Sequence, residues 1–220
     1  MRPEEYFDDL YSASDRYWWR DKDRFSLDPG AYPYSLLTQM TLRLLQREAP
    51  GRALDLGAGE GTDAIRLALL GYQVDAVEIS TVGAEKIERF ASEAAVKINV
   101  LVADITEFAP DGFYDVVISN GVLHYVENKE AAIRRMHAAT SVGGINVVSL
   151  WSTYTQVPDC HDRVPVFCDD EHGLTNKLYS EWQREFIYFD RDKTETSHSD
   201  SPPHRHSHIK LIARRTSSLM

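Results

Sequence analysis

Asp55-Leu56-Gly57-Ala58-Gly59-Glu60-Gly61 is the stretch that decides the fold of this chain. An apolar strand, expected at 52–56, runs into a loop with three glycines, and a helix is expected at 62–70. Glycine permits a sharp turn and a close approach of a ligand to the backbone, and the start of the helix offers free N–H groups. The stretch therefore predicts a nucleotide-type ligand on a strand–loop–helix unit.

Four more apolar strands alternate with helices after this unit. The strands are expected at 73–79, 98–103, 115–119 and 145–150, and the helices at 82–95 and 129–139, with Gly143 and Gly144 closing the last helix. An amphipathic helix at 35–48 precedes the first strand. This alternation predicts an α/β fold with a parallel sheet that is covered on both faces. Two extended runs, 183–190 and 206–215, predict an antiparallel hairpin at the end of the sheet.

The first 35 residues are unusually aromatic for the start of a chain. Trp18, Trp19 and Tyr34 lie among charged residues, and prolines and a glycine interrupt any long helix. We expect one or two short helices and an ordered loop, forming a lid segment (1–35) before a Rossmann-like domain (36–220). Trp151, just after the fifth strand, is placed to join this lid over a ligand. Packing of the aromatic rings on the edge of the sheet is the alternative interpretation.

Composition limits the partners of the protein. The chain has 220 residues, 43% of them hydrophobic, and a net charge of −10, which disfavours nucleic acid as a main partner. No apolar run approaches the roughly 20 residues of a membrane span. Two cysteines and no signal-peptide pattern favour a reducing, cytoplasmic setting. We expect a monomer or homodimer.

Acidic residues end the first three strands. Asp55 ends the first, Glu78 lies near the end of the second, and Asp104 follows the third. The carboxyl ends of parallel strands open onto one crevice, so these groups are expected to converge on one ligand. A carboxylate at Glu78 can accept hydrogen bonds from two ribose hydroxyls, and Asp104 can accept one from an adenine amino group.

The competing nucleotide is NAD, whose loop needs a third glycine where this chain has Thr62. Glu60 inside the loop and Asp55 beside it would repel a pyrophosphate. The same two acids would suit the ammonium group and the nearby sulfonium of S-adenosylmethionine. The loop therefore predicts S-adenosylmethionine, with NAD or a purely structural turn as weaker alternatives.

In order along the chain, Ala53–Gly61, Val77-Glu78-Ile79, Ala103-Asp104 and Asn120–His124 resemble the successive motifs of class I, Rossmann-like methyltransferases. Val142–Ser149, Val157-Pro158 and Ile209–Arg214 resemble the tellurite-resistance methyltransferase subgroup. The resemblance implies a doubly wound, seven-stranded, mostly parallel sheet with an antiparallel last strand.

The resemblance also implies the cofactor-binding residues. Asp55, Gly57 and Gly59 would hold the methionine part, and Glu78 the ribose. Asp104 and Ile105 would contact the adenine, and Asn120 would offer its backbone near the amino acid end. Ala58, Gly61 and Ile79 complete the expected cofactor-binding set.

Two residues after the fourth strand are candidates for catalysis. Methyl transfer mainly needs positioning and desolvation, and a general base only when the nucleophile carries a proton. His124 has the pKa for such a base, and Tyr125 follows it in the same segment. The alternative is that His124 packs in the protein or contacts the cofactor.

Histidines and cysteines also gather in the C-terminal third. His204, His206 and His208 alternate, so they would share one face of a strand, while Cys160, His161, Cys168 and His172 lie in a long loop. Neither group has the spacing of a known zinc motif, so no metal is expected.

Three functions remain open from the sequence. The first is an S-adenosylmethionine-dependent methyltransferase acting on a small molecule. The second is a cyclase or lyase that folds the cofactor on itself and releases methylthioadenosine, as in enzymes resembling azetidine-2-carboxylate synthase. The third is a non-catalytic protein that binds the cofactor.

Overall fold

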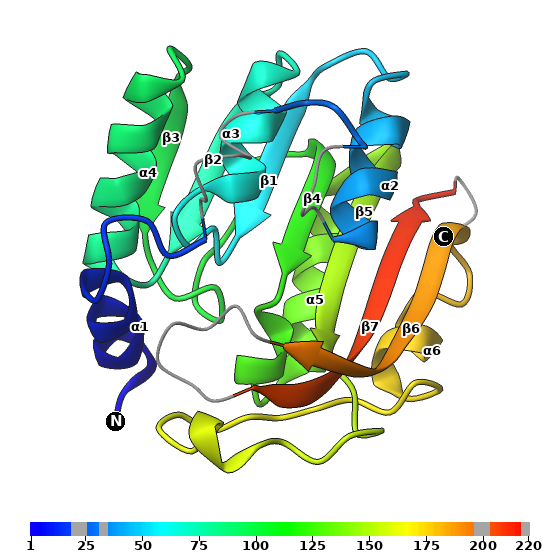
Figure 1. Ribbon diagram of the computed structural model, residues 1–220. Helices are drawn as coiled ribbons and strands as arrows, with labels where there is room; N and C mark the ends of the chain where they lie inside the picture. Colours follow the sequence, from blue (N-terminus) through cyan, green and yellow to red (C-terminus); the bar gives the residue numbers. More distant parts are fainter. Residues whose placement is uncertain (19–25, 31–34, 196–202, 217–220) are drawn as a thin grey trace.

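A computed structural model describes residues 1–18, 26–30, 35–195 and 203–216 (Figure 1). Seven strands form one sheet in the order β3-β2-β1-β4-β5-β7-β6. Their bounds are β1 Arg52–Leu56, β2 Gln73–Glu78, β3 Ile98–Val102, β4 Tyr114–Asn120, β5 Thr140–Trp151, β6 Gln183–Glu195 and β7 His204–Arg214. All neighbours are parallel except that β7 runs antiparallel to both β5 and β6. The predicted α/β class and the antiparallel last strand are confirmed.

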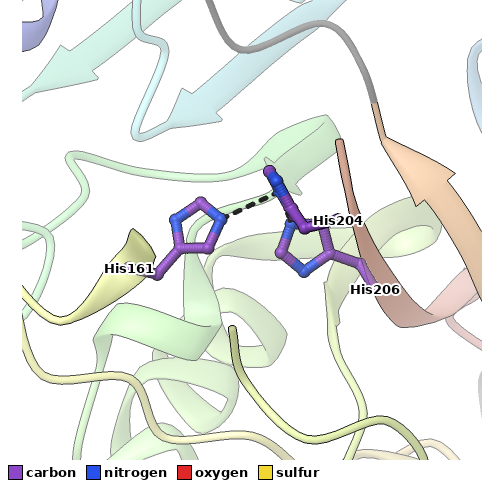
Figure 2. A group of neighbouring side chains, drawn as sticks. All are labelled: His161, His204 and His206. Atoms are coloured by element: carbon purple, nitrogen blue, oxygen red, sulfur yellow. Dashed lines mark hydrogen bonds between the residues drawn. The ribbon is translucent and has the colours of Figure 1, made fainter. Parts of the chain in front are cut away.

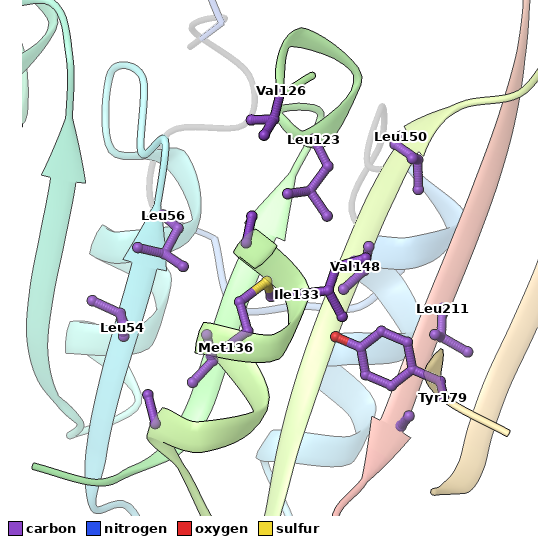
Figure 3. Close-up of a cluster of buried hydrophobic side chains, with 14 of the residues drawn as sticks. Leu54, Leu56, Leu123, Val126, Ile133, Met136, Val148, Leu150, Tyr179 and Leu211 are labelled. Atoms are coloured by element: carbon purple, nitrogen blue, oxygen red, sulfur yellow. The ribbon is translucent and has the colours of Figure 1, made fainter. Parts of the chain in front are cut away.

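Helices cover both faces of the sheet, as a doubly wound fold requires. They are α1 Pro3–Ser12, α2 Leu36–Leu45, α3 Thr62–Leu69, α4 Thr81–Glu93, α5 Lys129–Ala139 and α6 Leu174–Leu178, with short 3₁₀ helices η1 Leu123–Tyr125 and η2 Asp159–His161. On one face, Ile133 and Met136 of α5 pack with Tyr179 against β1, β5 and β7 (Figure 3). On the other face, α2, α3 and α4 supply a second core that includes Leu37 and Ile87. Every predicted helix and strand from 35 onward is therefore present, with ends shifted by a few residues.

The junction between α5 and β5 differs from the prediction. The helix ends at Ala139 as expected, but the strand begins at once with Thr140 and includes Gly143 and Gly144. The register against β4 shifts between Tyr114 and Val116, and Gly143 has φ +81°. These glycines serve an irregularity within the strand and do not end the helix.

The N-terminal segment begins with a helix, α1, that packs on α4. Pro3 starts this helix, where its missing N–H costs nothing, and Tyr6 and Tyr11 are buried. Trp19 and Tyr34, two of the predicted lid residues, lie outside the described residues, so the lid and the boundary at residue 35 stay predictions. No helix within the described ranges is both long and apolar enough to cross a membrane.

Candidate active site

A cavity of about 660 Å³ opens at the carboxyl ends of the parallel strands. It is lined by the ends of β1, β2, β4 and β5, by the segment after β3, by α1, and by part of β7. The parallel strands bring Asp55, Glu78 and Asp104 to this one cavity, as the sequence predicted. The convergence follows from topology, since these strands lie side by side in the same direction.

The glycine loop fits closely against its surroundings. Gly57 has φ +75°, and a Cβ atom there would lie 2.5 Å from Cγ2 of Val122. Gly59 has φ +59°, and its Cβ would lie 2.9 Å from the Tyr11 hydroxyl of α1. Gly57, Ala58 and Gly59 line the cavity, whereas Gly61 is the N-cap of α3 and is absent from the described lining. The first two glycines therefore allow the close approach that a ligand requires, and Gly61 starts the helix.

Asp55 is a buried acid that lacks a partner for one oxygen. Its side chain is buried, and Oδ2 has no hydrogen-bond partner. Burial raises the pKa of Asp55 well above its usual range, and the negative charges of Asp63 and Glu78 raise it further. A buried carboxylate in this state favours a cationic ligand, because a positive charge would offset both the desolvation and the repulsion.

Glu78 is held by backbone donors at the end of β2. The Gly59 amide donates to Oε2 at 2.7 Å, and the Ser80 amide donates to Oε1 at 2.9 Å. Burial nevertheless raises the pKa of Glu78 to about 7. The carboxylate is thus oriented into the cavity with its acceptor capacity only partly used.

The remaining predicted cofactor residues also line the cavity. Ile79 and Ile105 contribute apolar surface, and Oδ1 of Asp104 accepts a hydrogen bond from the Thr106 amide at 2.7 Å. Asn120 Nδ2 donates to Oδ2 of Asp63 at 2.8 Å, which fixes the amide side chain. Their cofactor contacts stay predictions, whereas their placement around one cavity is observed.

Asp63 was missed by sequence reasoning although it lines the same cavity. The sequence feature that could have identified Asp63 is its position in the first turn of the helix that follows the glycine loop. Tyr11, from the aromatic N-terminus, also lines the cavity.

The position of Glu60 differs from the one expected from the sequence. It was expected to face the cationic end of the cofactor, but it is fully buried and absent from the described lining of the cavity. Its carboxylate accepts hydrogen bonds from the backbone amides of Tyr17 and Trp18 at 2.7–2.9 Å and pairs with Lys86 at 2.7 Å. Because these partners are available on the N-terminal segment and α4, Glu60 joins that segment to the glycine loop. The acidic side chains that line the cavity near the glycine loop are Asp55, Asp63 and Glu78.

The far end of the cavity holds the predicted catalytic segment. The buried His124 ring stacks on Trp151, with ring centroids 4.3 Å apart and an interplanar angle of 11°. Burial, with smaller contributions from neighbouring histidines and Lys129, lowers the pKa of His124 well below its usual range. His124 is therefore neutral near pH 7, and its Nδ1 has no hydrogen-bond partner. The lowered pKa makes this ring a weaker base than the near-neutral histidine that the sequence suggested, and the base role stays a prediction.

Tyr125 and Trp151 lie beside His124, whereas the predicted lid residue Trp18 lies beside the glycine loop. Tyr125 lines the cavity and packs edge-on against Phe7 of α1 at 5.2 Å, and burial raises its pKa. Trp18 lines the cavity but is 44% exposed, whereas Trp151 is buried. Trp151 therefore belongs to the wall of the cavity, and Trp18 lies at its rim.

The structure combines residues from the two histidine groups that the sequence kept apart. His161 of η2 meets His204 and His206 of β7, and one ligand nitrogen from each lies within 4.8 Å of the others. The exposed His172 and the free Cys168 are not part of this described group, and the Cys160 side chain lies outside the described residues. Spacing could not reveal the group, because its members come from a loop and a distant strand.

The chain was compared with protein families and with curated proteins. Residues 39–212 match the family model described as "Tellurite resistance protein TehB". A relative from Rickettsia akari, named ubiquinone biosynthesis O-methyltransferase, is 30% identical over 135 residues, which cover 60% of this chain and 54% of the relative. The corresponding protein of Rickettsia felis is 34% identical over 44% of this chain and 39% of its own length. This chain thus spans about half or less of the length of these relatives.

Solved structures share the fold. TehB from Haemophilus influenzae aligns with a TM-score of 0.70 and 21% identity, covering 89% of this chain and 67% of that chain. A 1,6-didemethyltoxoflavin-N1-methyltransferase from Burkholderia thailandensis aligns with a TM-score of 0.59 and 17% identity, over 98% of this chain and 91% of that chain. The family match covers most of the chain, and it confirms the resemblance seen in the sequence motifs: this protein belongs to the TehB family of class I, Rossmann-like methyltransferases.

Proposed function

We propose that this protein is an S-adenosylmethionine-dependent methyltransferase that acts on a small molecule. The observation that carries the proposal is the buried, unpartnered Oδ2 of Asp55 at the glycine loop. An acidic cavity wall formed by Asp55, Asp63 and Glu78 suits a cationic adenosyl ligand and disfavours a pyrophosphate. Family membership and the methyltransferase names of the relatives support the same conclusion.

The cofactor residues of this proposal fill the half of the cavity near β1, β2 and β3. Asp55 would accept hydrogen bonds from the methionine ammonium, with Gly57, Ala58 and Gly59 providing close backbone contact. Glu78 would accept from the ribose hydroxyls, and Asp104 from the adenine amino group, with Ile79 and Ile105 against the ring. S-adenosylmethionine supplies the electrophilic methyl group when bound. The chain itself supplies position and the exclusion of water.

The acceptor would occupy the other half, between Trp151, His124 and Tyr125. A total volume of about 660 Å³ must hold both molecules, which favours a small acceptor over a macromolecule. Aromatic rings on this side can also contact a sulfonium favourably. We further propose a cytoplasmic setting, on the basis of the two cysteines, and a monomer or homodimer as the assembly.

The same fold supports other reactions, so the test must separate them. A structure described as the [4+2]-cyclase SpnF aligns with a TM-score of 0.62 and 16% identity. The experiment is incubation of the purified protein with S-adenosylmethionine, with and without a metabolite extract, followed by mass spectrometry of all products. S-adenosylhomocysteine and a methylated metabolite, formed only with the extract, are the expected result.

Two other outcomes would overturn the proposal. Methylthioadenosine formed from the cofactor alone would establish the cyclase or lyase alternative. Stable cofactor in every mixture would leave a binding protein. Asp55→Asn serves as the matched control, because it keeps the size of the side chain and removes the charge that should hold the cofactor.

A further inference from the structure

Three histidines beside the acceptor half of the cavity converge on one point. His204 Nε2 lies 3.1 Å from His161 Nε2 and 2.8 Å from His206 Nε2, and Figure 2 shows the three rings directed toward one another. His204 and His206 share a face of β7 because alternate residues of a strand do so. We propose that these three histidines form a binding site for a zinc-like divalent transition-metal ion.

The chemistry of the three nitrogens favours a metal over hydrogen bonds alone. An imidazole nitrogen carries either one proton or one lone pair, so His204 Nε2 can complete one of its two short contacts well, but not both. A metal ion would use the lone pairs of all three nitrogens at once. Nitrogens bound 2.0–2.1 Å from a tetrahedral zinc lie about 3.3 Å apart. The two short contacts at His204 would lengthen by only a few tenths of an ångström, and the third pair of ligand nitrogens already lies within 4.8 Å.

The surrounding structure holds two of these rings in place before any ion binds. His206 stacks on Trp151 with centroids 4.1 Å apart, and His161 packs edge-on against the same indole at 4.8 Å. His161 and His206 are both buried. Because these rings are already oriented, little side-chain freedom is lost when an ion binds.

The position of the site suggests what its open coordination position would bind. His161 and His206 line the main cavity next to His124, on the side away from the glycine loop. Three protein ligands with an open position are typical of catalytic zinc sites, in which the ion lowers the pKa of a bound hydroxyl group or water. We assign the open position to an oxygen or sulfur atom of the acceptor. This assignment rests on the proposed function, whereas the metal site itself does not.

The test is a titration of the full, chelator-treated protein with Co²⁺, followed by visible absorption, and then displacement with Zn²⁺. One Co²⁺ ion per chain with absorption bands typical of nitrogen ligation is expected. His204→Asn should weaken binding by at least about 100-fold, since even loss of an outer partner of a ligand costs 10–100-fold. His172→Asn is the matched control, because His172 is exposed and outside the group; it should bind Co²⁺ like the wild type.

Two further measurements keep the outcomes distinct. In ¹⁵N-imidazole spectra of the wild type, Zn²⁺ should shift the Nε2 signals of three histidines and leave those of His172 in place. S-adenosylhomocysteine binding without metal should persist in His204→Asn, since His204 does not line the described cavity. The proposed metal site would be overturned if the wild type did not bind Co²⁺, or if His204→Asn and His172→Asn lost Co²⁺ affinity to the same extent. Metal binding without any binding of S-adenosylhomocysteine would overturn the proposed function instead.

Discussion

The substitution Glu60→Gln should lower the free energy of unfolding of this protein far more than its small chemical change suggests. The Glu60 carboxylate is fully buried, and the Lys86 side chain is 9% exposed, with 2.7 Å between their charged atoms. Lys86 also donates to the backbone oxygens of Tyr11 and Ser14. The Glu60–Lys86 pair therefore links the N-terminal segment, at residues 11, 14 and 17–18, to the glycine loop and to α4.

The magnitude follows from leaving a buried ammonium without its counter-charge. Removing one partner of a buried ion pair costs about 3–5 kcal/mol. A glutamine oxygen in the place of Oε2 can still accept from the Tyr17 and Trp18 amides, but the NH₂ group in the place of Oε1 then faces the Lys86 ammonium. The total stability of such a domain is about 5–15 kcal/mol, so the loss is a large fraction of it.

The assay is urea unfolding followed by far-UV circular dichroism. With a urea m value of about 2–3 kcal/mol/M, a loss of about 4 kcal/mol lowers the midpoint by about 1–2 M. Glu130→Gln is the matched control, because Glu130 makes an exposed ion pair with Arg134 and should lose less than about 1 kcal/mol. Equal midpoints for the two variants would refute the assigned role of Glu60.

Three further predictions concern the cofactor half of the cavity. Gly57→Ala should lose about 1–3 kcal/mol more stability than Gly143→Ala. Both residues have positive φ, but a Cβ at Gly57 would collide with Val122, whereas a Cβ at Gly143 has no neighbour within 4 Å. The urea midpoints of the two variants measure this difference, and equal losses would mean that backbone strain accounts for the whole effect. The affinity for S-adenosylhomocysteine should fall about tenfold from pH 8 to pH 6, because ribose hydroxyls need the ionised Glu78 and its ligand-free pKa is raised to about 7. Calorimetry across this range should show that the dependence weakens in Glu78→Gln, and a flat wild-type profile would contradict it. Asp55→Asn should raise the melting temperature of the ligand-free protein, because it removes the cost of ionising a buried carboxyl group whose Oδ2 lacks a partner, and it should weaken S-adenosylhomocysteine binding by about 10–100-fold. Thermal unfolding with and without ligand measures both changes, and a lower melting temperature without ligand would show that Asp55 already has a favourable partner.

The sequence determined most of the fold and the cofactor half of the cavity, because both depend on local signals. The strand, glycine loop and helix from β1 to α3 follow from apolar periodicity and from residues suited to a sharp turn. Parallel strands place their carboxyl ends at one edge, so Asp55, Glu78 and Asp104 had to meet there. The hairpin of β6 and β7 was visible as two extended runs.

The tertiary structure alone decided which distant side chains become partners. Glu60 pairs with Lys86 and with backbone amides more than 40 positions earlier, and no local pattern predicts such contacts. His161 meets His204 and His206 because β7 inserts antiparallel beside β5, which places the histidine end of β7 next to Trp151. Sequence spacing describes neighbours along one element, whereas this group and the Glu60 pair depend on how separate elements pack together.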